Sequence, residues 1–368
     1  MTDARTIAAL RRLSAAERPK RPRFADASAP RTTAASVGDD EIVGSDGRIL
    51  RRRRIVLDAI PCRSGLCSMC PLPAESAYAK LGAPSDAAVL TQFERALALP
   101  GRIDVATLYH DGNFFSSAEI GGELRRDLLR VAASSGLREL IVESLPRFVT
   151  DEALSEASAI LGDVSLTCAM GLQCADDLLR RTAILSTFDW SDFAAATAAL
   201  RRFGMRAGAF LLLGIPFLSP EEAEEELLSG IARLDDELGI DDPTICPLRI
   251  EPGTLAHRVM LAGFLVPPTL GDARRFVRLA RSERPSARAR VALSLLDERG
   301  GKNRAAGCGS ECEAAALADV MAFSSGRPFS SSPPSCACSS ARGGRRPFVP
   351  SELAVRVEAF LSAMSVSV

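Results

Sequence analysis

The chain has little lysine, no long apolar run and almost no net charge. Of its 45 basic residues only Lys20, Lys80 and Lys302 are lysine, and the formal net charge is −1. Such a balance excludes a general electrostatic attraction to nucleic acid or to a membrane surface. No apolar stretch approaches the roughly 20 residues that cross a bilayer, and the N-terminus lacks the apolar core of a signal peptide. We therefore expect a cytoplasmic protein with no membrane contact, whose ten cysteines serve metal or redox chemistry rather than disulfides.

The first 47 residues predict a flexible N-terminal arm. Residues 6–17 could form a short helix, residues 18–23 are basic and broken by proline, and the rest is mostly Ala, Ser and Thr without a period. A mobile tail and a nucleic-acid contact are the two interpretations of this arm. Arg51 to Arg54 then lead into the first strand, where they could touch phosphate or form a solvated strand entrance.

Strands and helices alternate over residues 48–285. Residues 207–213 are a continuous apolar run, which is typical of a parallel strand buried on both faces. Ser219-Pro220-Glu221-Glu222 is a strong helix start, with a capping hydroxyl, a proline and two acids that favour the helix dipole. Six βα units predict an α/β fold, an incomplete (β/α)6 barrel of the TIM type, with its site at the C-terminal ends of the strands. The expected strands are residues 54–60, 105–109, 138–143, 164–168, 207–213 and 244–250.

Three cysteines directly follow the first expected strand. Cys62, Cys67 and Cys70 lie on one short loop, and three thiolates there can hold three irons of a [4Fe-4S] cluster while the fourth iron stays open. An open iron can bind and reduce a substrate or cofactor. The alternative is a zinc loop, which usually closes with a fourth Cys or His nearby, whereas the next such residue is His110. The loop therefore predicts an iron–sulfur cluster.

This cysteine loop resembles that of the radical S-adenosylmethionine (SAM) superfamily. Residues 48–338 as a whole are similar to the radical SAM subunit of archaeosine synthase and, more distantly, to the radical SAM domain of the Elongator catalytic subunit. Several short segments, which occur in the order of the strand ends, carry this resemblance. They are Tyr109-His-Asp-Gly-Asn-Phe-Phe-Ser116, Val142-Glu-Ser-Leu-Pro-Arg-Phe-Val149, Met170-Gly-Leu-Gln173, Leu212-Leu-Gly-Ile-Pro-Phe-Leu-Ser219, and Glu251-Pro-Gly-Thr254 with Gly263-Phe-Leu-Val-Pro-Pro268.

The resemblance and the geometry of strand ends together suggest residues that bind SAM. The backbone around Gly112 and Asn113 could accept the SAM ammonium, or form an ordinary turn. Met69 could contact adenine, or pack within its loop. The side chains of Glu143 and Gln173 could bind ribose hydroxyls or the ammonium; a solvated strand-end carboxylate is the alternative for Glu143. Arg180 or Arg181 could bind the methionine carboxylate, although helix-surface charge is the ordinary role of such residues.

The chain departs from its relatives at several positions. The cysteines are spaced by four and then two residues, whereas the commonest radical SAM loop has three and then two. Leu145 stands where the relatives usually have Arg, a charge that Arg147 could replace. Residues 186–188 are Ser-Thr-Phe where archaeosine relatives tend to have Lys-Gly-Phe. These differences predict altered substrate handling.

Residues 286–368 predict a small Cys-rich C-terminal module. The spacings Cys308 to Cys312 and Cys336 to Cys338 resemble segments that end the archaeosine relatives. Four thiolates suit a structural zinc ion, although they would also satisfy a second iron–sulfur cluster; free thiols in a loose tail are the third interpretation. We expect the remaining cysteines to pack within strands. They are Cys168, Cys174 and Cys246.

The predicted function is that of a radical SAM enzyme. A reduced cluster would cleave SAM to a 5′-deoxyadenosyl radical that abstracts hydrogen from the substrate. The resemblance implies a tRNA-borne modified base as substrate and a partner subunit, with an electron donor of the flavodoxin or ferredoxin type. A small molecule of natural-product biosynthesis is the alternative substrate, because fold and cofactor do not fix the substrate. A scaffold of the same fold that binds a partner without catalysis is the alternative function.

Overall fold

The fold is built around one curled sheet of eight strands. The computed structural model describes residues 3–18, 31–44, 47–72, 76, 78, 81–292, 310–329 and 343–364. Strand order in the sheet equals sequence order, and every neighbouring pair from β2 to β8 is parallel. This topology confirms the predicted incomplete parallel barrel. The strands are β1 (Ser36–Val43), β2 (Ile49–Val56), β3 (Val105–Tyr109), β4 (Glu139–Glu143), β5 (Ser165–Gln173), β6 (Arg206–Leu213), β7 (Thr244–Pro247) and β8 (Arg290–Val291).

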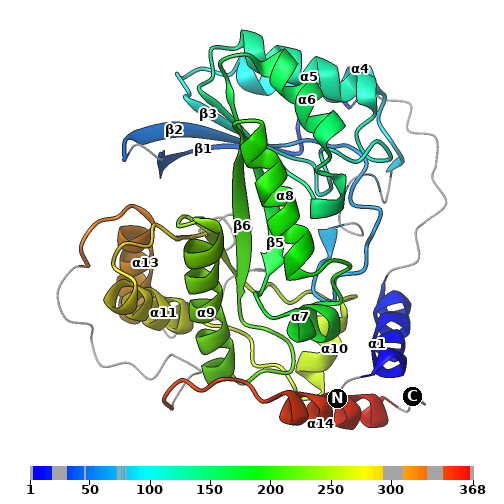
Figure 1. Cartoon of the computed structure of the whole chain (residues 1–368), viewed down its shortest axis with the longest axis vertical. Helices are drawn as coiled ribbons and strands as arrows, with labels where there is room; N and C mark the ends of the chain where they lie inside the picture. Colours follow the sequence, from blue (N-terminus) through cyan, green and yellow to red (C-terminus); the bar gives the residue numbers. More distant parts are fainter. Residues whose placement is uncertain are drawn as a thin grey trace.

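Helices cover the outer, convex face of this sheet (Figure 1). The main apolar core lies between the helices and the strands, which bury alternate residues against it. The predicted helix start at Ser219 is confirmed, because Ser219 and Glu222 form a reciprocal capping box at the first turn of α9. The covering helices are α4 (Asp86–Leu97), α5 (Gly122–Ser134), α6 (Asp151–Leu161), α8 (Trp190–Arg202), α9 (Pro220–Leu238) and α11 (Leu270–Glu283).

The N-terminal segment contributes an element that the sequence did not predict. β1 pairs antiparallel with β2 along its whole length. The two acids of β1 form ion pairs with three arginines of β2: Arg53 with Asp39 at 2.7 Å, and Arg52 and Arg54 with Asp40 at 2.6 and 3.2 Å. These three arginines are therefore neither a solvated strand entrance nor an open phosphate site. The first strand of the barrel spans Ile49–Val56, so it begins and ends earlier than the predicted residues 54–60.

The Arg53 side chain is buried more deeply than those of Arg52 and Arg54. Its side chain is 1% exposed, and its guanidinium donates to the carbonyl oxygens of Ala96, Leu99 and Pro100, at the end of α4. The carbonyl groups at the C-terminal end of a helix carry partial negative charge, so a cation there favours the helix dipole. Arg53 thus fastens the first strand to the first covering helix.

A second apolar cluster closes the carboxyl end of the barrel. It packs Ala9 and Leu10 of α1 (Ala4–Glu17) against Val357 and Phe360 of α14 (Pro350–Ala363), with Val259 of α10 (Leu255–Leu261) beside them. Figure 1 accordingly shows α1 beside α14. The helix expected over residues 6–17 is confirmed by α1, and Asp3 caps it. Among the described residues, no helix is both long and apolar enough to cross a bilayer.

The C-terminal part is only partly described. α13 (Ser310–Ser324) packs against α11, and β8 adds to the barrel sheet beside β7. Cys312 is half-buried on α13. The other cysteines of the predicted zinc or second-cluster site lie outside the described residues, so that site and the division at residues 47 and 285 stay predictions. These cysteines are Cys308, Cys336 and Cys338.

Candidate functional site

The cysteine loop is held at the carboxyl end of the barrel by backbone contacts to three other segments. The Cys62 amide donates to the carbonyl oxygen of Asp111, after β3, at 2.9 Å. The Ser68 amide and hydroxyl donate to Ile184 and Ala183, after β5, at 2.9 and 2.6 Å. The Ser68 carbonyl in turn accepts from the amide of Ala256 in α10 at 2.9 Å. Loops that are far apart in sequence therefore fix the positions of the three cysteines.

The three thiols are half-buried on this loop. Burial, and to a lesser degree the neighbouring Cys62, raises the pKa of Cys67 to about 11, and burial raises that of Cys70 well above its usual range. Within the described part of the chain, no three His, Cys, Asp or Glu side chains converge on one point as ligands of a single metal ion would.

Gly112 occupies a space with no room for a side chain. A Cβ atom there would lie 2.6 Å from a carboxylate oxygen of Glu119, 2.8 Å from His110 Nε2 and 2.9 Å from the Cys62 amide nitrogen. Contacts this short do not occur between real atoms of these kinds. The predicted SAM-ammonium loop thus packs directly against the first cysteine.

Asn113 connects this loop to its surroundings through a buried side chain. Its amide nitrogen Nδ2 lies 3.6 Å from Cys62 Sγ, and its Oδ1 accepts from the Leu145 amide at 2.8 Å. The Asn113 carbonyl, expected to face the SAM ammonium, accepts from the Ser116 amide at 3.0 Å. Asn113 therefore ties together the cysteine loop and the ends of β3 and β4.

Glu119 is the important site residue that sequence reasoning missed. Its carboxylate is buried and accepts from the Asn113 amide at 2.5 Å, from Asn113 Nδ2 at 2.9 Å and from the Arg63 amide at 3.0 Å. Glu119 lies in the loop before α5, which begins only at Gly122. A possible signal was its position between the apolar Phe115 and Ile120, both buried, because an acid is rarely buried without partners.

Glu143 and Met69 lie near the same edge. Glu143 ends β4, and burial raises its pKa to about 8, with the charge of Asp111 adding to the effect. Met69, between two of the cysteines, packs against the second apolar cluster, which includes Leu179 and Leu255. Both residues are thus close to the loops that hold the cysteines, and their roles toward SAM stay predictions.

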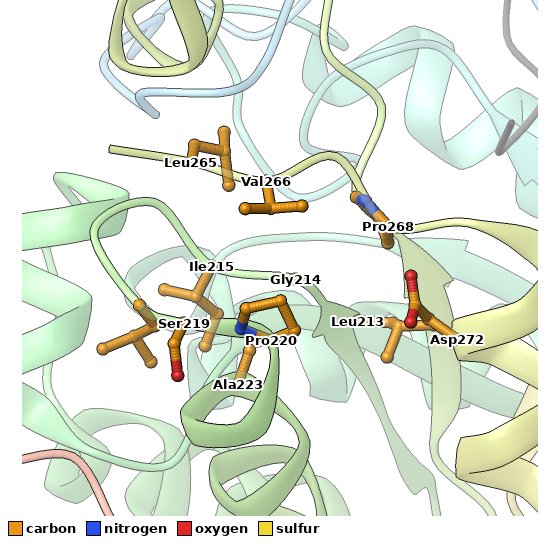
Figure 2. A pocket seen from close by; sticks show the side chains of 11 residues that line it. Leu213, Gly214, Ile215, Ser219, Pro220, Ala223, Leu265, Val266, Pro268 and Asp272 are labelled. Atoms are coloured by element: carbon orange, nitrogen blue, oxygen red, sulfur yellow. The ribbon is translucent and has the colours of Figure 1, made fainter. Parts of the chain in front are cut away.

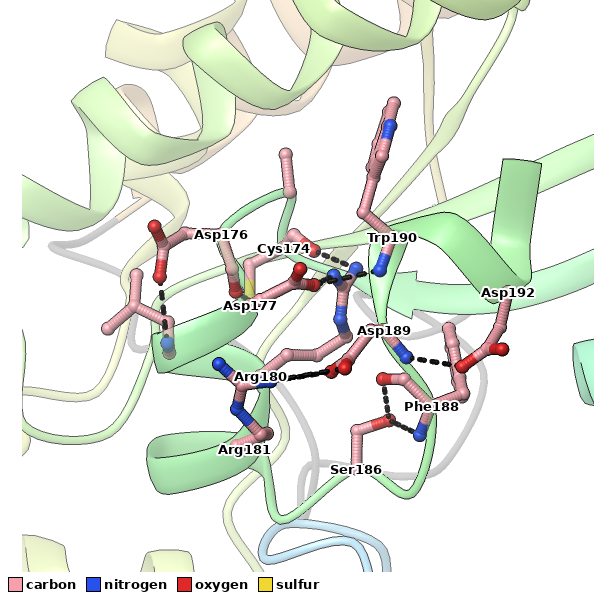
Figure 3. A network of polar contacts seen from close by, with 12 residues as sticks. Cys174, Asp176, Asp177, Arg180, Arg181, Ser186, Phe188, Asp189, Trp190 and Asp192 are labelled. Carbon is pink, nitrogen blue, oxygen red and sulfur yellow. Dashed lines mark hydrogen bonds and ion pairs between the residues drawn. The ribbon is translucent and has the colours of Figure 1, made fainter. Parts of the chain in front are cut away.

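Gln173 and Arg180 follow β5. Gln173 has a φ of +70° at an irregularity in the β5–β6 pairing, and its side chain folds back over Gly171. Arg180 is fully buried, where it donates to the Cys174 carbonyl at 3.0 Å and pairs with Asp177 (Figure 3). If Arg180 binds the methionine carboxylate as predicted, its guanidinium must do so in addition to its contacts with the Cys174 carbonyl and Asp177.

The other arginine candidates have exposed side chains. Arg181 pairs with Asp189 at 3.1 Å, as Figure 3 shows. Arg147, which could replace the arginine missing at Leu145, donates to Thr187 Oγ1 at 3.0 Å and to the hydroxyl of Ser64 in the cysteine loop. Arg147 therefore reaches the cysteine loop from the 3-10 turn η1 (Pro146–Phe148) that follows β4, two residues beyond the position that the relatives use.

Two of the segments that carried the family resemblance pack on each other. Gly214, after β6, has a φ of +93°, and a Cβ atom there would lie 3.2 Å from the ring of Pro268. Figure 2 shows both residues around a small apolar pocket. Its volume of about 20 Å³ leaves room for a single water molecule. This contact is structural, and the pocket is too small for a substrate.

Known proteins resemble the chain in sequence and in fold. No family model matches it. Archaeosine synthase subunit beta from Methanosarcina acetivorans is 25% identical over 259 residues, which are 68% of this chain and 72% of that protein. The corresponding subunit from Thermococcus kodakarensis is 26% identical over 259 residues, or 68% and 77% of the two chains.

Solved structures also align with the chain at low sequence identity. Methylornithine synthase aligns with a TM-score of 0.49 at 13% identity, over 85% of this chain and 81% of that one. An N-terminally truncated Elp3 from Methanocaldococcus infernus aligns with a TM-score of 0.44 at 16% identity, over 55% and 51% of the two chains. The chain is a homologue of archaeosine synthase subunit beta over about two thirds of its length, as its motifs predicted, and its own strand order makes it an incomplete parallel α/β barrel.

Proposed function

We propose that the protein is a radical SAM enzyme whose cluster is bound by Cys62, Cys67 and Cys70. The observation that carries the proposal is the contact between the cysteine loop and the Gly112–Asn113 loop, since a Cβ at Gly112 would meet the Cys62 amide. When bound, a [4Fe-4S] cluster would supply one electron to SAM, which breaks into methionine and a 5′-deoxyadenosyl radical that takes hydrogen from the substrate.

The number of thiols on the loop suits a cluster better than a single zinc ion. A structural zinc ion usually takes four protein ligands, and the next Cys or His after Cys70 is His110. Three thiolates can hold three irons of a [4Fe-4S] cluster and leave the fourth iron open. Asn113 Nδ2, 3.6 Å from Cys62 Sγ, is placed to donate to a cluster-bound thiolate.

The residues around the cysteines would hold SAM and keep water away. We assign the ammonium to the Gly112–Asn113 loop and hydroxyl contacts to Glu143 and Gln173, with Met69 against adenine. Because α1 and α14 pack together over this end of the barrel, they would exclude solvent from the reaction. We further propose cytoplasmic location, a donor of the flavodoxin or ferredoxin type, and a partner subunit, which the name of the relatives supports.

The test is anaerobic reconstitution with iron and sulfide, followed by addition of SAM and dithionite. We expect about four irons per chain and 5′-deoxyadenosine, both lost in Cys67→Ala and kept in Cys246→Ala, a cysteine of β7 outside the loop. About eight irons would assign the C-terminal cysteines to a second cluster rather than to zinc. Iron without SAM cleavage would instead indicate a non-catalytic scaffold, and absence of iron would refute the proposal.

A further inference from the structure

The curled sheet encloses a cavity of about 290 Å³ on its concave face. All eight strands contribute lining residues, and β2, β4 and β5 contribute every other residue, as the alternation of a strand requires. Tyr109, the last residue of β3, forms part of the wall, so the cavity reaches the edge where the cysteine loop lies. At the other end it reaches Glu139, Thr244 and Arg290, which begin β4, β7 and β8. The volume is close to that of the smaller ligand sites in proteins.

Most charged groups in the wall of this cavity are paired with one another. Arg52 and Arg54 share Asp40. Arg206 pairs with Asp242 at 2.8 Å and lies 3.7 Å from Glu139. These contacts neutralise most of the charge that the cavity buries.

Arg290 is the exception among these arginines. Within the described residues its side chain has neither an ion pair nor a hydrogen bond, although it faces the cavity. Burial lowers the pKa of Arg290 most, Asp242 raises it, and Arg52 lowers it again; Asp242 itself pairs with Arg206 at 2.8 Å. A guanidinium without a direct hydrogen-bond partner in a largely enclosed space favours an anion that it can bind through two parallel hydrogen bonds.

We propose that Arg290 binds the carboxylate of a small, elongated carboxylic acid, the substrate of the proposed radical SAM reaction, so this inference rests on that function. One unpaired guanidinium neutralises one charge, which fits a carboxylate better than a phosphate dianion. The ion pairs of Arg52, Arg53 and Arg54 with β1 leave these arginines of β2 unable to form an open basic face for RNA. A free acid is therefore favoured over a tRNA-borne one.

The length of the barrel sets the length of the acid. Glu139 and Ile141 of β4 line the cavity, and Glu143 ends the strand two residues further on, so the barrel is roughly 13 Å long from Glu139 to this end of β4. The carboxylate would lie beside Arg290, at the N-terminal ends of the parallel strands. The reacting C–H bond would lie near their C-terminal ends, where the cysteine loop is. The carboxylate and the reacting carbon are then separated by several methylene groups.

The test measures binding of hexanoate to the full, reconstituted chain, with hexanamide as an uncharged probe of the same shape. No SAM or reductant is added, and chloride keeps the ionic strength equal. We expect hexanoate, but not hexanamide, to raise the unfolding midpoint, by at least about 2 °C at ten times its dissociation constant. Arg290→Gln should weaken hexanoate binding about 10- to 100-fold, whereas Arg130→Gln, an exposed arginine of α5, should leave it unchanged.

Each other outcome decides against the inference. Equal effects of hexanoate and hexanamide, equal binding by Arg290→Gln, or a response to inorganic phosphate alone would overturn it. Removing an unpaired cation should not prevent folding, and Arg290→Lys, which keeps the charge, should retain part of the binding. Because SAM is absent from this assay, binding that persists in a chain unable to cleave SAM would refute only the proposed function.

Discussion

Replacing Gly112 with alanine should loosen the cysteine loop. The added methyl group would lie 2.6 Å from the Glu119 carboxylate and 2.9 Å from the Cys62 backbone nitrogen. The carboxylate cannot move away without losing its hydrogen bonds to Asn113 and Arg63, so the Cys62 backbone must shift. Overpacking of this kind costs about 1–3 kcal/mol. We expect a fall of that size in the free energy of unfolding, and a lower iron content after reconstitution.

Gly344→Ala is the matched control for this substitution. Gly344 lies before α14 with a negative φ and no atom within 4 Å of its would-be Cβ, so alanine there should be neutral or stabilise by up to about 1 kcal/mol. Chemical denaturation without cluster measures stability, and iron analysis after reconstitution measures loop geometry. If Gly112→Ala matched Gly344→Ala in both measurements, the contact between the two loops would not be as tight as we describe, and the basis of the proposed function would fall with it.

Two further predictions concern buried carboxyl groups. Glu119→Gln should lower the free energy of unfolding by about 2–3 kcal/mol, because the new amide NH₂ would face N–H groups that now donate hydrogen bonds to the carboxylate. Glu123→Gln is the control, since the Glu123 side chain is 90% exposed. Equal denaturation midpoints for the two variants would contradict this prediction. Burial and Asp111 raise the pKa of Glu143 from 4.5 to about 8, so the folded state binds more protons than the unfolded state between these values. The free energy of unfolding should therefore fall as pH rises from 4.5 to about 8, by at most about 1.4 kcal/mol per pH unit. The other titratable side chains near Glu143 are those of Tyr109 and Cys246. Denaturation of Glu143→Gln at pH 5, 7 and 9 should lack this component, and a pH dependence equal to that of the unchanged chain would refute the assignment.

The parts of the fold that sequence predicted are those set by local patterns. The apolar run before Leu213 and the capping box at Ser219 depend on neighbouring residues, and β6 and α9 formed where expected. β1 was missed because its acids have no partners in their own segment; they pair with Arg52 to Arg54, which lie 12 to 14 residues further on.

The same distinction holds within the site. Local spacing sufficed to find the cysteine loop, since its chemistry depends on three residues within nine positions. Glu119 could not be found in that way, because it accepts a hydrogen bond from the backbone amide of Arg63, which lies 56 positions earlier. Arg290 was missed for a related reason: its significance depends on the pairing of every other arginine in the cavity wall.

The pairing of β1 with β2 determines how the chain can be shortened. Without residues 36–43, the backbone of β2 would lose its antiparallel partner and present a row of unsatisfied N–H and C=O groups at the edge of the sheet. Such an edge invites pairing with a second copy of the chain, and three arginines would lose their counter-charges at the same time. Any truncation at the N-terminus should therefore keep Ser36 to Val43. A variant that lacks these residues should aggregate and should bind polyanions more strongly than the intact chain does.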